Sequence, residues 1–105
     1  MIVFIDIDET IANTPESRDY SLSTPIIENI KKANKYFDDG HTVVYWTARG
    51  SGSGLDWYDL TKSQLDLWGV KYHELRLGKP VYDLFIDDKT MNPSAWETSG
   101  HKKGK

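Results

Sequence analysis

The chain opens with a nearly continuous apolar run, residues 2–7, that passes directly into acids in the stretch MIVFIDIDET. A run that is apolar on both rows of side chains is typical of a strand covered on both faces, as strands in parallel sheets are. Three carboxylates follow within four positions, on Asp6, Asp8 and Glu9. Because like charges this close repel, the run predicts a buried strand whose carboxyl end meets a positive partner.

The next part of the chain alternates between loop, helix and strand patterns. Residues 9–23 have no clear period and form a predicted loop. Thr24 then has the character of a helix N-cap, with Pro25 at the first helical position and Gly40 as the terminator. Residues 42–46 form a β-branched and aromatic run, which predicts a second strand.

The second half repeats this alternation. A glycine- and serine-rich loop leads to Asp56, which opens a predicted helix that ends at Gly69. Residues 70–75 form a weaker strand candidate and residues 84–86 a stronger one, and Pro93 begins a last short helix. Such alternation predicts an α/β fold, a three-layer sandwich with a central parallel sheet.

The connection between the last two predicted strands is short. The link at 76–82 has fewer than the dozen or so residues that a parallel crossover normally needs. Either residues 70–75 form a brief edge strand, or the segment crosses the end of the sheet without a helix.

Composition narrows the class of protein. The 105 residues predict one domain, spanning 1–97, followed by a flexible basic tail at 98–105. A net charge of −3 gives no strong attraction to nucleic acid or acidic membranes, and the apolar opening is too short for a signal peptide or a membrane span. With no cysteine, a reducing and therefore cytoplasmic location is expected.

The residues next to the predicted strand ends are the candidates for function, because ligands of open α/β sheets bind outside the carboxyl ends of the strands. They are Asp6, Asp8 and Thr10 after the first strand, Thr47 and Arg49 after the second, Lys79 before the last, and Asp87 and Asp88 after it. Oxygen ligands without His or Cys suit Mg²⁺, while a hydroxyl and an ammonium suit phosphoryl oxygens. A carboxylate beside a metal and a phosphate can act as a nucleophile, and a second carboxylate nearby can act as acid and base. The set predicts phosphoryl transfer.

These residues also carry a resemblance to a known family. The stretch DIDET resembles the DxDxT signature of the haloacid dehalogenase-like (HAD) superfamily. Thr47 resembles the second motif of that superfamily, Lys79 the third, and Asp87 with Asp88 the fourth. The resemblance covers the chain from Met1 to about residue 92.

The resemblance implies a Rossmann-like core and a role for each matching residue. Asp6 would be the nucleophile and Asp8 the general acid and base. Mg²⁺ would be held by Asp6, the backbone carbonyl of Asp8 and Asp87, with Asp88 binding directly or through water. The phosphoryl oxygens would be held by Thr47, Ala48 and Lys79.

Two features separate this chain from its closest motif pattern. Glu9 stands where the family commonly has glycine, and this departure puts the substrate class in doubt. The candidate substrate contacts are Glu9, Thr10 and Arg49. For Arg49 a solvent-facing salt bridge is an equal alternative. The gaps between motifs leave no room for a cap domain, so the resemblance implies a capless enzyme with an open site, which accepts a large substrate or takes a lid from a second subunit.

The leading hypothesis is a Mg²⁺-dependent phosphomonoesterase that forms an aspartyl-phosphate and acts on a small phosphorylated metabolite, such as a sugar phosphate. That substrate class is implied only by resemblance to small capless phosphatases. Removal of a terminal phosphate from a nucleotide or nucleic acid is the alternative, although the chain has no basic stripe. A phosphoacceptor receiver domain would place its Lys-Pro after the paired acids, whereas here Lys79 precedes them. A catalytically silent regulatory relative is the last alternative.

Overall fold

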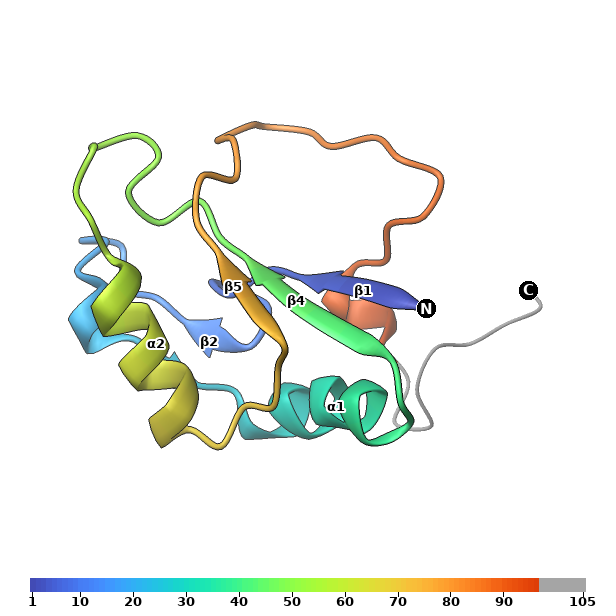
Figure 1. The fold of residues 1–105 in the computed structure, drawn as a ribbon. Coiled ribbons are helices and arrows are strands. Elements are labelled where there is room, and N and C mark those ends of the chain that lie inside the picture. The colour runs from blue at the N-terminus through green and yellow to red at the C-terminus, as the bar shows by residue number, and fades with distance from the viewer. Residues whose placement is uncertain (97–105) are drawn as a thin grey trace.

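The computed structural model describes residues 1–96 and has an α/β fold built on a three-stranded parallel sheet (Figure 1). The strands are β1 (Ile2–Ile5), β4 (Thr42–Trp46) and β5 (Glu74–Arg76), in the order β1-β4-β5. All the pairs are parallel, as predicted for an α/β protein. The basic tail predicted at 98–105 lies outside the described residues.

The remaining elements are short apart from two helices. These are α1 (Ile27–Asp38) and α2 (Tyr58–Leu67), the 3-10 helices η1 (Tyr20–Leu22) and η2 (Pro93–Ala95), and the antiparallel strands β2 (Ala12–Asn13) and β3 (Thr24–Pro25). Within residues 1–96, no helix combines the length and the apolar character needed to cross a membrane.

The hydrophobic core lies on one face of the sheet. Alternate strand residues such as Ile5, Val43 and Tyr45 join one cluster with Ile30 of α1 and Leu65 of α2. Both α-helices therefore contribute their buried residues to the same face.

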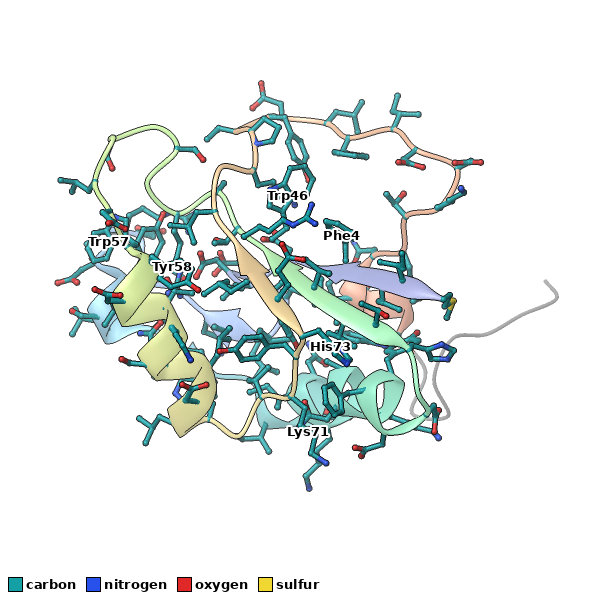
Figure 2. The ribbon with its side chains drawn as sticks, in the orientation of Figure 1. Phe4, Trp46, Trp57, Tyr58, Lys71 and His73 are labelled. Carbon is teal, nitrogen blue, oxygen red and sulfur yellow. The ribbon has the colours of Figure 1, made fainter. Side chains whose placement is uncertain are left out.

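The opposite row of strand side chains is more open. Phe4 is 48% exposed, and its ring meets Trp46 edge-on with ring centroids 5.9 Å apart (Figure 2). Neither α1 nor α2 packs against this face of the sheet. Among residues 1–96 the fold therefore has two layers, the sheet and the helices on one face, where the sequence predicted three.

The ends of the two α-helices agree with the sequence prediction, whereas the start of α1 does not. The helix ends are as predicted, because Gly40 and Gly69 both adopt positive φ angles, +94° and +74°. The predicted helix start is wrong, since Thr24 pairs with β2 and α1 begins only at Ile27. The reason is a tertiary contact: the Ile26 N–H donates to the Ile11 carbonyl at 2.8 Å, which holds this segment extended against the first loop.

The stretch predicted as the strongest late strand, residues 84–86, forms no strand. It belongs to a long arc between β5 and η2 that runs apart from the sheet (Figure 1). Leu84 is 75% and Ile86 85% exposed. An apolar run indicates that a segment is able to pair but does not determine which sheet edge receives it. As a result, no strand among residues 1–96 covers the outer edge of β1.

One buried hydroxyl stands out in the core. Tyr45 is fully buried and packs edge-on against Tyr72, and its Oη has no hydrogen-bond partner within the described chain. Burial raises the pKa of this phenol far above its ordinary value. The ring contributes packing, while the hydroxyl carries an unmet desolvation cost.

Replacing Tyr45 with phenylalanine is therefore expected to raise the free energy of unfolding, by about 1 kcal/mol, because an unsatisfied buried polar group costs about 1–3 kcal/mol. Urea denaturation followed by circular dichroism measures this. The control is Tyr72→Phe, whose exposed hydroxyl donates to Asp66 at 3.1 Å, with an expected change within about 0.5 kcal/mol. A loss of stability in Tyr45→Phe would contradict the assignment of an orphan hydroxyl.

Candidate active site

The parallel register places the ends of all three strands at one edge of the sheet. Ile5 of β1 is level with Tyr45 of β4, so Asp6 comes level with Trp46, one residue before Thr47. After β5 the chain turns back, and the Lys79 N–H donates to the Thr47 carbonyl at 3.1 Å. The structure thus brings together Asp6, Asp8, Thr47, Ala48 and Lys79, as expected if these strands are neighbours.

Asp6 is the accessible acid of this group. Its side chain is 37% exposed, and its Oδ1 accepts the Ile7 N–H at 2.8 Å. Oδ2 lies 3.5 Å from Nζ of Lys79, whose side chain is only 13% exposed. Burial raises the pKa of the Asp6 carboxyl; Lys79 opposes that rise and the Asp8 charge adds to it, and the net direction is upward.

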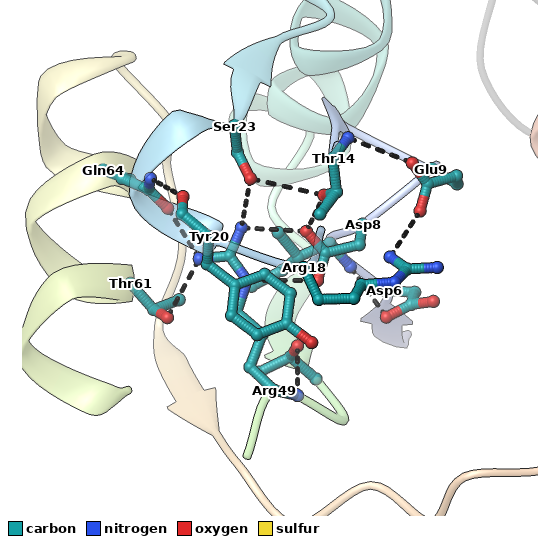
Figure 3. A network of polar contacts seen from close by, with 12 residues as sticks. Asp6, Asp8, Glu9, Thr14, Arg18, Tyr20, Ser23, Arg49, Thr61 and Gln64 are labelled. Atoms are coloured by element: carbon teal, nitrogen blue, oxygen red, sulfur yellow. Dashed lines mark hydrogen bonds and ion pairs between the residues drawn. The ribbon is translucent and has the colours of Figure 1, made fainter. Parts of the chain in front are cut away.

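Asp8, two residues later, is held in a different way. Its carboxylate forms a two-point ion pair with Arg49, with Nη2 2.9 Å from Oδ1 and Nε 3.1 Å from Oδ2 (Figure 3). The Thr14 hydroxyl also donates to Oδ1. Only 15% of the Asp8 side chain is exposed, so the acid is fixed in one orientation.

Arg49 differs from both expectations for it. Its side chain is completely buried, so it is neither a solvent-facing salt bridge nor placed on the surface to touch a substrate. Nη1 donates to Thr61 Oγ1 at 3.1 Å and to Gln64 Oε1 at 2.6 Å, both on α2 (Figure 3). The one sequence signal for this arrangement is a pair of polar residues, Thr61 and Gln64, one turn apart on the buried side of α2.

Glu9 and Thr10 shape the turn that follows Asp8. Glu9 has a φ of +62°, a left-handed conformation in which glycine is free of strain. Its carboxylate accepts the Thr14 N–H at 3.0 Å and pairs with Arg18 at 3.3 Å, and these contacts hold the turn. Thr10 contributes its carbonyl, which accepts Asn29 Nδ2 at 2.7 Å. Their role as substrate contacts stays a prediction.

Thr47 and Ala48 form the turn after β4. Thr47 is almost fully buried, and its Oγ1 accepts the Arg49 N–H at 3.1 Å. This contact uses a lone pair and leaves the hydroxyl proton as a donor. The Ala48 carbonyl accepts the Ser51 N–H at 2.9 Å, which starts the loop toward α2.

Asp87 and Asp88 do not join the other acids. Both are exposed in the arc beyond β1, and Asp87 Oδ1 accepts the Lys89 N–H at 2.9 Å in a local turn. Across residues 1–96, no three His, Cys, Asp or Glu side chains are grouped closely enough to hold a metal ion. The predicted meeting of four acids is therefore not found. It required a strand at 84–86 that would place Asp87 and Asp88 beside Asp6, and the structure has no strand there.

Asp6→Asn and Asp8→Asn are expected to change stability in opposite directions at pH 7 with a chelator present. A raised pKa means that the ionised Asp6 disfavours folding, so its asparagine variant gains stability. The gain is expected to shrink as the pH falls toward the ordinary value of 3.8, where the wild-type group is protonated. Asp8→Asn leaves a buried guanidinium without its counter-ion and should lose about 3–5 kcal/mol.

Urea denaturation at several pH values measures both variants. Asp66→Asn is the matched control, because this acid pairs with Lys62 on the exposed side of α2 and is worth at most about 1 kcal/mol. Equal losses in Asp6→Asn and Asp8→Asn would contradict the electrostatic difference between the two sites.

A crystal structure of a structural-genomics target from Vibrio cholerae is similar to this chain. The match has a TM-score of 0.76 and 26% sequence identity, and covers 89% of this chain and 84% of that one. The sequence matches no protein-family model, and no curated protein aligns with it significantly. The similarity supports the α/β fold over most of the chain.

Proposed function

We propose that this chain is a Mg²⁺-dependent phosphomonoesterase of the HAD type, acting through an aspartyl-phosphate on a small phosphorylated metabolite such as a sugar phosphate. The observation that carries the proposal is the pairing of two unlike acids at the strand ends. Asp6 is partly exposed and lies 3.5 Å from the Lys79 ammonium, while Asp8 is held in one orientation by Arg49. A nucleophile needs an accessible carboxylate, and a group that transfers a proton needs a fixed orientation. Because the Arg49 ion pair also favours ionised Asp8, the proton for the leaving group has to be taken up against that preference.

The proposed reaction has two steps. The Asp6 carboxylate attacks phosphorus, a new P–O bond forms to Asp6, and the bond to the leaving alcohol breaks while Asp8 supplies its proton. Asp8 then takes a proton from water, which attacks the phosphoryl group and releases phosphate and free Asp6. Lys79, which is partly exposed, is the donor for the phosphoryl oxygens, and the buried Thr47 hydroxyl would have to be uncovered to donate as well.

The described residues fit a magnesium ion only in part. Asp6 and the carbonyl of Asp8 lie at the strand ends, whereas Asp87 and Asp88 lie in the exposed arc. When bound, Mg²⁺ supplies the positive charge that neutralises the acids and the phosphoryl oxygens. A complete donor set needs residues 87 and 88 at the same edge as Asp6.

The sequence itself suggests how this set is completed. Residues 3–6 read VFID and residues 84–87 read LFID, with the same order of apolar residues before an acid. We propose that residues 84–86 pair in parallel with the uncovered edge of β1, which completes the Rossmann-like core. If residue 84 is level with residue 3, Asp87 comes to lie beside Asp6.

The connection from β5 can cover the sideways distance for this pairing, but it is shorter than the dozen residues of a usual parallel crossover, so it would cross the sheet without a helix. Three strand spacings separate β5 from a strand beyond β1, about 14 Å at roughly 4.8 Å each. Residues 77–83 span up to about 23 Å when extended at roughly 3.3 Å per residue. The exposed Leu84 and Ile86 would also cover part of their apolar surface against β1.

Purified protein is expected to hydrolyse p-nitrophenyl phosphate and small sugar phosphates in the presence of Mg²⁺. Asp6→Asn should abolish turnover because an amide cannot attack phosphorus, and EDTA should also abolish it. Release of inorganic phosphate measures both effects. The control variant is Asp59→Asn, which changes an exposed acid on α2 and should leave the rate unchanged. Full turnover by Asp6→Asn would disprove the nucleophilic role.

Hydrogen exchange tests the proposed strand. With Mg²⁺ and orthovanadate present, the amides of residues 84–86 should become protected relative to protein in EDTA, because pairing gives them carbonyl partners on β1. Asp87→Asn should weaken this protection, whereas Asp83→Asn, an exposed acid before the strand, should not. Unchanged exchange at 84–86 with both ligands bound would rule out the pairing.

A further inference from the structure

The guanidinium of Arg49 is fully hydrogen-bonded although it is completely buried. Its five N–H groups match five contacts: two to Asp8, two from Nη1 to Thr61 and Gln64, and a longer one of 3.4 Å from Nη2 to Ser23 Oγ. The ring of Tyr20 covers it at 4.7 Å. The guanidinium cannot move without breaking contacts to several segments at once.

We propose that Arg49 is a positioning residue for Asp8, and that α2 sets the orientation of this acid through Thr61 and Gln64. The inference rests on the proposed function, because it assigns a purpose to Asp8 in catalysis. Arg49 itself has no exposed surface from which to touch a substrate, so it acts only through Asp8.

The two-point contact explains why arginine serves here. Nε and Nη2 bind both carboxylate oxygens, which fixes the plane of the carboxyl group as well as its place. A lysine would offer one point of charge and leave the carboxyl free to rotate about that point. The Thr14 hydroxyl donates a third hydrogen bond to the carboxylate, at Oδ1. These contacts hold the Asp8 carboxyl group in one orientation.

Stability alone does not account for this arrangement. A buried ion pair is on balance close to neutral, and well-packed apolar residues of similar volume often replace one with no loss. Here every N–H group of the arginine is hydrogen-bonded, and the partner of the arginine is the proposed acid and base itself. If Arg49 positions Asp8, its replacement should slow most the substrates whose leaving group needs a proton. If Arg49 only stabilises the fold, its replacement should slow all substrates by the same factor.

The experiment measures kcat and KM for Arg49→Lys on a series of aryl and alkyl phosphates with Mg²⁺. For alkyl phosphates we expect kcat/KM to fall by about 100-fold or more, the usual range for a positioned acid, with KM within about threefold. For p-nitrophenyl phosphate, whose leaving group needs little protonation, the fall should be much smaller. Arg76→Lys is the matched control, because this arginine pairs with the exposed Glu74.

Four further measurements separate positioning from folding. Circular dichroism gives the folded fraction of each variant, by which the rates are corrected. Gln64→Met removes one support of Arg49 without touching the ion pair, and it should show the same leaving-group trend in weaker form. In an Asp8→Ala background, Arg49→Lys should cause no further loss. Guanidinium at millimolar concentration should partly restore Arg49→Ala.

The outcomes distinguish the two proposals. An active wild type whose Arg49→Lys and Gln64→Met variants lose the same factor on every substrate would overturn the positioning role alone. An additional loss from Arg49→Lys in the Asp8→Ala background would overturn it as well. A folded wild type that releases no phosphate from any substrate would overturn the proposed function and this inference with it.

Discussion

Burial of the Arg49 guanidinium is the interaction on which the organisation of this domain depends. Moving such a cation out of water costs several kcal/mol unless every N–H is satisfied and a counter-ion is close. Arg49 follows β4, and its partners come from the loop after β1, from the segment before β3, and from α2. A sheet of only three strands is therefore tied to its first loop and to α2 by one side chain.

The same edge of the sheet contains two acids in contrasting environments. Asp8 has its charge neutralised by Arg49, and its contacts favour folding. Asp6 has a partner in Lys79 that does not fully offset its burial, and its pKa is raised. Charge that the fold leaves uncompensated is typical of functional sites, where stability is given up for binding or chemistry. The two acids differ although they are only two residues apart, because Asp8 meets Arg49 and Asp6 meets Lys79.

Local sequence pattern was enough to find the parts of the fold that local forces control. The strands at residues 2–5 and 42–46 follow from apolar and β-branched runs, and the helix ends at Gly40 and Gly69 follow from the backbone freedom of glycine. The contacts that sequence could not give are those fixed by distant partners. Thr24 carries the signal of an N-cap, but the chain after it is held extended by Ile11. Arg49 resembles a surface residue in sequence, and its burial depends on where α2 packs. For the site, the meeting of Asp6, Asp8, Thr47 and Lys79 followed from strand order, whereas the place of Asp87 and Asp88 depended on a sheet edge that no local pattern specifies.

The uncovered edge of β1 links the proposed fold to the proposed cofactor. An open, apolar edge strand invites pairing, and residues 84–86 offer about three backbone hydrogen bonds worth roughly 0.5–1.5 kcal/mol each. Pairing in register would also bring Asp87 next to Asp6, and two such charges about 4 Å apart repel by about 4 kcal/mol at an effective dielectric constant near 20. The gain and the repulsion are similar in size, so neither state is strongly favoured by the chain alone. A divalent cation between the two acids converts the repulsion into attraction, and binding of the ion then becomes linked to formation of the strand. In this proposal the four-acid site and the fourth strand form together.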